Sequence, residues 1–92
     1  MHEEAMLKDV IRKAEEVARQ EGATRVTRVR LWVGARSHLG GPELRARWMA
    51  AVRSSPLSEA EVEIETSRDP TDPNAEGVVL RSLDMDFEGG RS

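Results

Sequence analysis

The chain of 92 residues contains no cysteine and no tyrosine, and its only aromatic side chains are Trp32, Trp48 and Phe87. Without cysteine it can form neither disulfides nor thiolate zinc sites, and it has no cysteine nucleophile. With so few aromatic residues, its core must be built mainly from aliphatic side chains. The length leaves room for one core, so we expect a single domain spanning residues 1–92.

Long apolar runs are also absent. No stretch approaches the ~20 apolar residues of a membrane-spanning helix. The start, His2-Glu3-Glu4, lacks the basic and apolar regions of a signal peptide. The formal net charge of −3 gives no overall attraction to nucleic acid. We therefore expect a cytoplasmic protein that contacts neither membranes nor nucleic acid.

Two segments have the periodicity of helices. From Ala5 to Gln20, apolar residues recur at spacings of three and four, and Gly22 stands where a C-terminal cap is expected. Pro42 is well placed as the first residue of a second helix, which Ser54-Ser55-Pro56 ends. The inner face of this second helix is expected to carry Leu44, Trp48, Met49 and Val52.

Three segments alternate between apolar and polar residues, as half-buried strands do. They are Thr24–Val33, Glu61–Glu65 and Val78–Phe87. Trp32 is expected on the outer face of the sheet, as an exposed aromatic side chain. The inward residues of the three strands are expected to be Val29, Leu31, Val33, Val62, Ile64, Leu83, Met85 and Phe87.

The order α-β-α-β-β predicts an α+β fold in which two helices cover one face of a three-stranded sheet. The outer face would carry Arg28 and Arg30 on one strand and carboxylates on the other two, as solvated cross-strand pairs. Glycine, proline and polar residues predict loops at Gly34–Gly41 and Ser67–Gly77, the second of them a mobile surface loop. Gly89–Ser92 is expected to be a disordered tail.

No catalytic motif can be read from the sequence. It contains no serine motif, no glycine-rich phosphate loop and no His-Glu-x-x-His, so we expect no enzyme activity. The two histidines, His2 and His38, are the remaining candidates for chemistry. A loop histidine such as His38 is usually a surface residue, and a terminal histidine is usually solvated.

His2 differs from an ordinary surface histidine because it stands next to the chain start. Methionine aminopeptidase removes the initiator only before small residues, so Met1 is expected to stay. Its α-amino group has an ordinary pKa of about 8, and a metal can displace its proton near neutrality. That amine, the amides of His2 and Glu3 and the His2 imidazole offer four nitrogens in a plane, which suit Ni(II) or Cu(II). Glu3 can add a carboxylate or orient the site.

Beyond this triplet, nearly the whole sequence resembles the HypA/HybF family of hydrogenase and urease nickel-insertion metallochaperones. The matching segments, in order, are Met1-His2-Glu3, Gly22-Ala23, Arg25–Leu31, Gly34 with Ser37, Pro42-Glu43-Leu44, Ala60–Glu65 and Leu80–Met85. The resemblance implies a Ni(II) carrier with Met1, His2 and Glu3 as its metal site. It further implies delivery toward [NiFe] hydrogenase maturation, with a maturation GTPase or a hydrogenase large-subunit precursor as partner.

The sequence departs from the family's pattern between its last two strands. The family normally inserts a zinc domain with two CxxC pairs there, whereas this chain has only the loop 67–77 and no cysteine. We therefore expect a short version that lacks the zinc site and is a monomer or a weak homodimer. In the loop after the first strand, where the family often carries an acid, His38 is a candidate auxiliary metal ligand.

Two other hypotheses stay open beside the nickel carrier. A metal-free adaptor of the maturation complex would bind its partners equally well after His2→Ala. A nucleic-acid-binding protein would use Arg25, Arg28, Arg30 and Trp32, although the negative net charge counts against it. Trp32, as an exposed aromatic, could mark a dimer or partner surface, but an isolated one needs no such explanation.

Overall fold

The computed structural model describes residues 2–88, with side chains described from residue 4 onward. Met1 and the predicted tail Gly89–Ser92 lie outside this range. The elements, in chain order, are α1 His2–Glu21, β1 Ala23–Val33, α2 Gly41–Ala51, a 3-10 helix η1 Pro56–Glu59, β2 Glu61–Thr66 and β3 Val78–Phe87. The predicted α+β order is therefore confirmed, and only η1 was not expected.

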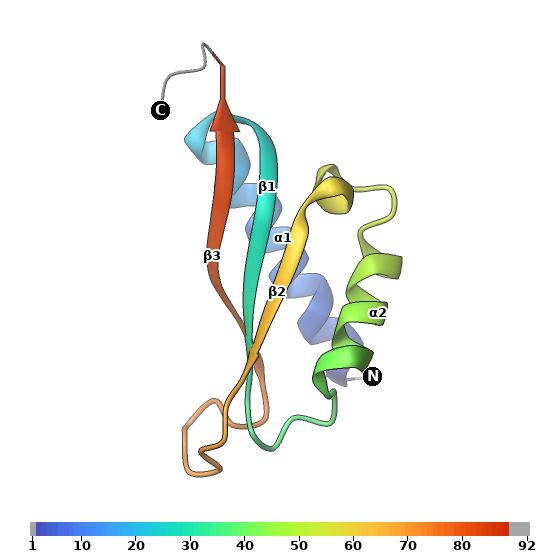
Figure 1. Cartoon of the computed structure of the whole chain (residues 1–92), viewed down its shortest axis with the longest axis vertical. Coiled ribbons are helices and arrows are strands. Elements are labelled where there is room, and N and C mark those ends of the chain that lie inside the picture. The colour runs from blue at the N-terminus through green and yellow to red at the C-terminus, as the bar shows by residue number, and fades with distance from the viewer. Residues whose placement is uncertain (1, 89–92) are drawn as a thin grey trace.

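The three strands form one mixed sheet in the order β2-β1-β3. β1 runs parallel to β2 and antiparallel to β3, and α2 with η1 makes the crossover that a parallel pair requires. Figure 1 shows α1 behind the sheet and α2 beside β2. Both helices contribute to one core with the inward residues of the strands, so one sheet face is covered. None of the helices in the described part of the chain has the length and apolarity to cross a bilayer.

α1 follows the predicted periodicity but begins earlier. Leu7, Val10, Ile11 and Ala14 are buried, and Gly22 adopts φ 75°, the left-handed conformation of a C-terminal glycine cap. The helix starts at His2 rather than at Ala5. The first four N–H groups of a helix have no intrahelical partner, and carboxylates near that end favour the helix dipole. The acidic start of the chain is therefore compatible with an early first turn.

α2 starts at Gly41, one residue before the predicted Pro42, with Gly40 as N-cap and proline in its first turn. One of the predicted core residues of α2 is not buried. Leu44, Trp48 and Val52, spaced by four, are at most 1% exposed. The prediction for Met49 is wrong, because its side chain is 48% exposed. One residue beyond Trp48 turns about 100° around the helix axis, which carries Met49 off the buried stripe.

The unpredicted helix η1 fills the core between α2 and β2. Ser55 caps it, because its Oγ accepts the Leu57 N–H at 3.0 Å. The same hydroxyl donates to Glu15 Oε2 at 2.6 Å and so ties η1 to α1. Leu57 is 1% exposed. The sequence signal was present, since serine followed by proline is a frequent start of a helix.

The pairing of β1 with β3 has three register shifts, and two of them decide which residues of the sheet face the helices. Val26 pairs with Met85 and Arg28 with Asp84, which leaves Thr27 as an extra residue on β1. On β3 the extra residue is Arg81, because Arg30 pairs with Ser82 and Leu31 with Leu80. The inward side chains are then Val78, Leu80, Leu83 and Met85.

Phe87 was predicted to face the core, but its side chain is 39% exposed. It pairs with Ala23, the first residue of β1, directly after the end of α1. The helix that covers the rest of the strand therefore does not extend over Phe87.

The loop 67–77 packs against the end of β1. Ser67 N–H donates to Val33 O at 2.8 Å, and Gly34 N–H donates to Gly77 O at 2.9 Å. Gly34 is buried, and a Cβ added to it would overlap the backbone of Ala75. Glycine is therefore required at Gly34 by the close approach of this loop.

Candidate functional site

The first turns of α1 lie at the end of the sheet where β1 finishes. The Sδ atom of Met6 accepts the backbone N–H of Val78 at 3.2 Å. Val78 pairs with Val33, the last residue of β1. The loop that carries His38 leaves β1 at Gly34, so it belongs to the same end of the molecule. The fold thus brings the start of α1 and the His38 loop to one end of the sheet.

The predicted ligands differ in how much the structure describes. Met1 lies outside the described residues, and His2 and Glu3 form the first turn of α1 with undescribed side chains. His38 is exposed in the loop between β1 and α2. Among residues 4–88, no three histidine or carboxylate side chains are grouped as metal ligands. Coordination by Met1, His2, Glu3 and His38 stays a prediction.

Backbone contacts hold the loop on both sides of His38. Ser37 N–H donates to Gly34 O at 3.1 Å, and Ser37 Oγ accepts the Leu39 N–H at 3.2 Å. The Leu39 side chain is 4% exposed and belongs to the core. A leucine anchored in the core directly after His38 limits how far this segment can move.

A second contact joins the two loops at this end. Arg36 N–H donates to Ala75 O at 2.7 Å, and the Arg36 guanidinium lies 3.2 Å from the carboxylate of Glu76. Both side chains are exposed, so the ion pair contributes little and the backbone bond matters more. The loop 67–77 therefore supports the segment that leads into His38.

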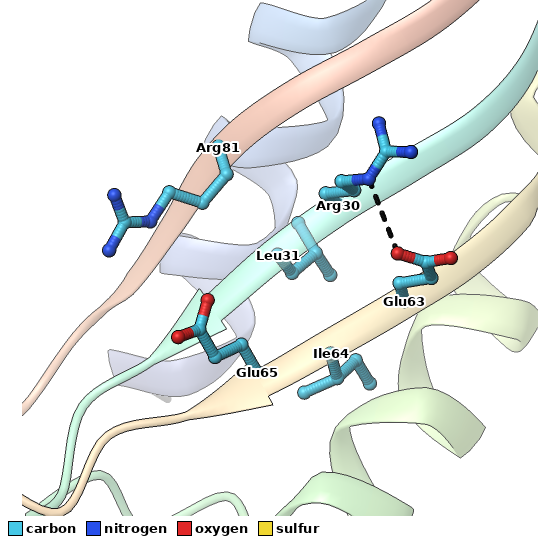
Figure 2. A pocket seen from close by; sticks show the side chains of 6 residues that line it. All are labelled: Arg30, Leu31, Glu63, Ile64, Glu65 and Arg81. Atoms are coloured by element: carbon cyan, nitrogen blue, oxygen red, sulfur yellow. Dashed lines mark hydrogen bonds and ion pairs between the residues drawn. The ribbon is translucent and has the colours of Figure 1, made fainter.

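The outer face of the sheet carries the predicted ion pairs. Arg30 lies 2.9 Å from Asp84 and 3.2 Å from Glu63, which Figure 2 shows opposite it on the neighbouring strand. Arg28 lies 3.0 Å from Glu61. The hydrogen bond from Arg30 lowers the pKa of Asp84 and raises the pKa of Arg30 itself. This face is an ordered set of mutually neutralised charges.

Trp32 is on the predicted outer face but is not an exposed aromatic. Its side chain is only 7% exposed, and the guanidinium carbon of Arg81 lies 5.6 Å from the ring centroid. Arg81 is the bulged residue of β3, and Figure 2 shows it on the strand beside β1. The bulge could not be read from the alternation of the strand. Since Trp32 is covered, and since Arg28 and Arg30 are paired, this face gives no support to nucleic-acid binding.

A cleft between the helices was missed by the sequence patterns. It has a volume of about 400 Å³ and is lined by Glu4, Leu7, Lys8, Arg47, Ala50 and Ala51. The available signal was the row of alanines in α2, which lies off the buried stripe. The lining begins only two residues after His2.

Comparisons with protein-family models and with solved structures both lead to HypA proteins. Residues 1–71 match the family model described as hydrogenase/urease nickel incorporation, metallochaperone, HypA. None of the curated proteins matches the sequence. The structure is similar to the solution structure of the Ni metallochaperone HypA from Helicobacter pylori, with a TM-score of 0.76 and 17% identity. That similarity covers 94% of this chain and 98% of the other, and at this identity it shows a common fold.

Proposed function

We propose, given that this chain belongs to the HypA family of hydrogenase and urease nickel-incorporation metallochaperones, that it binds Ni(II) as cargo and delivers it for nickel-enzyme maturation. The observation that carries this proposal is the family match over residues 1–71, which includes Met1-His2-Glu3. The chain would act as one domain, 1–92, with the loop 67–77 in place of a zinc domain. The match ends inside that loop.

The ligands we propose are the Met1 amine, the amides of His2 and Glu3, and the His2 imidazole. α1 begins at His2, so these amides belong to the first four N–H groups of a helix, which have no intrahelical acceptor. Their deprotonation by the metal therefore breaks no intrahelical N–H bond. Four nitrogens in one plane do require non-helical dihedral angles, so the first turn must unwind, at low cost for a helix end.

His38 is the auxiliary ligand in this proposal. It is exposed, and its loop lies at the same end of the sheet as the start of α1. The neighbouring Leu39 is anchored in the core, so the His38 imidazole can move only a short way as it approaches the metal. Because the chain has no cysteine, the carrier would work without a thiolate zinc site.

The partners in this proposal are a maturation GTPase, a hydrogenase large-subunit precursor, or both, in the cytoplasm. The carrier itself would be a monomer or a weak homodimer. It would perform no catalytic step, because ligand exchange from a terminal site into the recipient transfers the metal.

The test is a Ni(II) titration of the untagged chain, followed by calorimetry and visible absorption. We expect one site per chain with the absorption of planar low-spin nickel. His2→Ala should abolish it, whereas His38→Ala should weaken it by about 10–100-fold, the range for loss of one supporting group at a metal site. Nickel binding that survives His2→Ala unchanged would contradict the proposed ligand set.

One observation favours a second function, a metal-free adaptor. The chain has no cysteine, so it lacks the thiolate ligands of the family's zinc domain. An adaptor would bind the maturation partner with the same affinity before and after His2→Ala and with or without nickel. A carrier would bind its recipient more tightly when loaded, so the same binding isotherm separates the two.

A further inference from the structure

α2 is apolar on two sides, but the described structure covers only one of them. Leu44, Trp48 and Val52 fill the core. On the other side Met49 is 48% exposed, and Ala46, Ala50 and Ala51 are exposed as well. Apolar residues that are exposed on a helix beside its buried stripe add a second apolar side to it. The exposed side of α2 therefore has the composition of a contact surface.

This exposed side continues into the cleft against α1. Ala50, Ala51 and Leu7 give the cleft an apolar lining, while Lys8 and Arg47 stand at it as cations. Its volume of about 400 Å³ is sufficient for one or two apolar side chains of a bound segment. Because Glu4 also lines it, an occupant would lie beside the start of α1.

Three cations of α1, α2 and the turn after α2 have no carboxylate partner within residues 4–88, in contrast to the paired arginines of the sheet. Among the described residues, no carboxylate lies within ion-pairing distance of Lys8, Arg45 or Arg53. Arg45 instead donates to the backbone oxygen of Val62 at 2.9 Å, which fixes its position at the edge of β2. Arg45, Met49 and Arg53 are spaced by four, so they follow one line along the helix and the turn after it.

The local charge is opposite in sign to that of the chain. Lys8, Arg45, Arg47 and Arg53 are accompanied by Glu4 and Glu43, which leaves a local charge of +2, whereas the chain carries −3. Of these acids, Glu43 forms only a long pair with Arg47, at 3.8 Å. The α2 docking surface, defined as Lys8, Arg45, Arg47, Met49, Ala50 and Arg53, thus joins an apolar centre to a cationic rim.

We infer that the α2 docking surface binds an acidic amphipathic segment of the protein that receives the nickel. Apolar side chains of that segment would enter the cleft at Ala50 and Ala51 and cover the exposed Met49 on the same helix. Its carboxylates would face Lys8, Arg45 and Arg53. Naming the occupant as the nickel recipient rests on the proposed function. The expected acidic character of the occupant is independent of the proposed function, because it follows from the charges of the surface alone.

Two other occupants fit this surface less well. A nucleic acid would meet an apolar centre with exposed Met49 and a chain of net charge −3, which repels phosphate. A second copy placed by two-fold symmetry would set the same cationic rim against itself. An acidic protein segment satisfies both the charge and the apolar centre.

The test uses two designed helical peptides as probes for the full-length chain. Both have leucines at spacings of three and four, flanked by glutamates in one peptide and by lysines in the other. By calorimetry and amide-shift mapping, we expect the acidic peptide to bind on α2 and the first turns of α1. We expect the lysine peptide to bind at least tenfold more weakly, and added salt to weaken the acidic complex.

A matched pair of variants locates the contact. Among residues 4–88, Met49 and Phe87 are the two exposed large hydrophobic residues, and Phe87 lies on β3, away from the α2 docking surface. Met49→Gln should weaken acidic-peptide binding by about tenfold, as loss of a central apolar contact does, while Phe87→Gln should change it less than about twofold. Nickel titration of both variants should match the unchanged chain.

Several results would overturn the inference. They are equal binding of the two peptides, no binding of the acidic peptide at about 1 mM, and an unchanged affinity after Met49→Gln. A single-stranded oligonucleotide that shifts the same α2 amides more strongly would identify nucleic acid instead. A dimer that Met49→Gln dissociates in sedimentation would identify a second copy. If the unsubstituted chain binds the acidic peptide but not Ni(II), the carrier function is refuted and the docking surface is still supported.

Discussion

Arg30 forms a bidentate hydrogen-bonded pair with Asp84, in which Nη1 donates to Oδ1 at 2.9 Å and Nη2 donates to Oδ2 at 3.3 Å. This contact crosses from the central strand β1 to the edge strand β3 directly beside the Arg81 bulge. A two-point contact fixes direction as well as distance. It therefore helps to hold β3 in register at the position where its alternation changes.

Asp84→Asn should lower stability in a pH-dependent way. The Arg30 hydrogen bond lowers the pKa of Asp84 in the folded chain relative to the unfolded one. The stability gained is therefore present above the unfolded pKa, about 3.9, and is lost as pH falls through the folded value. Urea denaturation at pH 7 should show a lower midpoint for the variant, and the difference should vanish in acid. A difference that persists unchanged in acid would contradict this linkage.

Gly34→Ala should disturb the loop 67–77. A Cβ there overlaps the backbone of Ala75, so the loop must move away or strain, at a cost of about 1–3 kcal/mol. Thermal unfolding and the amide shifts of residues 67–77 measure the two effects. Gly40→Ala is the control, because a Cβ at Gly40 has no atom within 4 Å. Equal effects of the two substitutions would exclude the close approach as the cause.

Ser55→Ala should separate η1 from α1. The substitution removes both the cap of Leu57 N–H and the 2.6 Å bond to Glu15, and cap losses cost about 1 kcal/mol. Denaturant unfolding gives the change in the free energy of unfolding. Ser54→Ala, at an exposed neighbour, should change it by less than about 0.5 kcal/mol. If the two variants unfold alike, Ser55 has no linking role.

Nickel should shorten α1. Coordination by the amides of His2 and Glu3 requires the first turn to unwind, so far-UV circular dichroism should lose roughly four residues of helix on loading. A chelator should restore the signal. Acetylation of the Met1 amine should prevent both the binding and the loss of helix. Binding without any change at Glu4 to Met6 in amide spectra would contradict coordination through these amides.

The elements themselves were predictable because local signals agreed with the fold. α1 combines a regular apolar stripe with Gly22 as its cap, and β1 alternates from Val29 to Val33. The burial of Leu44, Trp48 and Val52 likewise follows from their spacing. At these positions the chain's own periodicity decides which side is buried, and no distant residue is needed.

The error at Met49 is local, because this residue lies about 100° off the buried stripe of α2. The other errors arise where distant parts of the chain decide, and Phe87 is exposed because α1 ends before reaching it. Trp32 is covered by Arg81, which only a bulge on another strand places there. Neither of these two relationships, at Phe87 and at Trp32, has a local pattern in sequence.

The candidate site also has one part that the sequence predicts and one part that depends on packing. The terminal triplet and His38 are ligands predicted from residue chemistry and family resemblance, and the fold adds only that their segments share one end of the sheet. The cleft between α1 and α2 depends on how two helices pack, which their separate sequences do not specify.

The two ends of the loop 67–77 are anchored to consecutive residues, Ser67 to Val33 and Gly77 to Gly34. Entry and exit therefore stand side by side, and whatever connects them adds no separation to the strands. The entropy of closing such a connection grows only slowly with its length. Residues can therefore be inserted or removed between Ser67 and Gly77 while the sheet, its register and the end that holds the start of α1 and the His38 loop keep their arrangement.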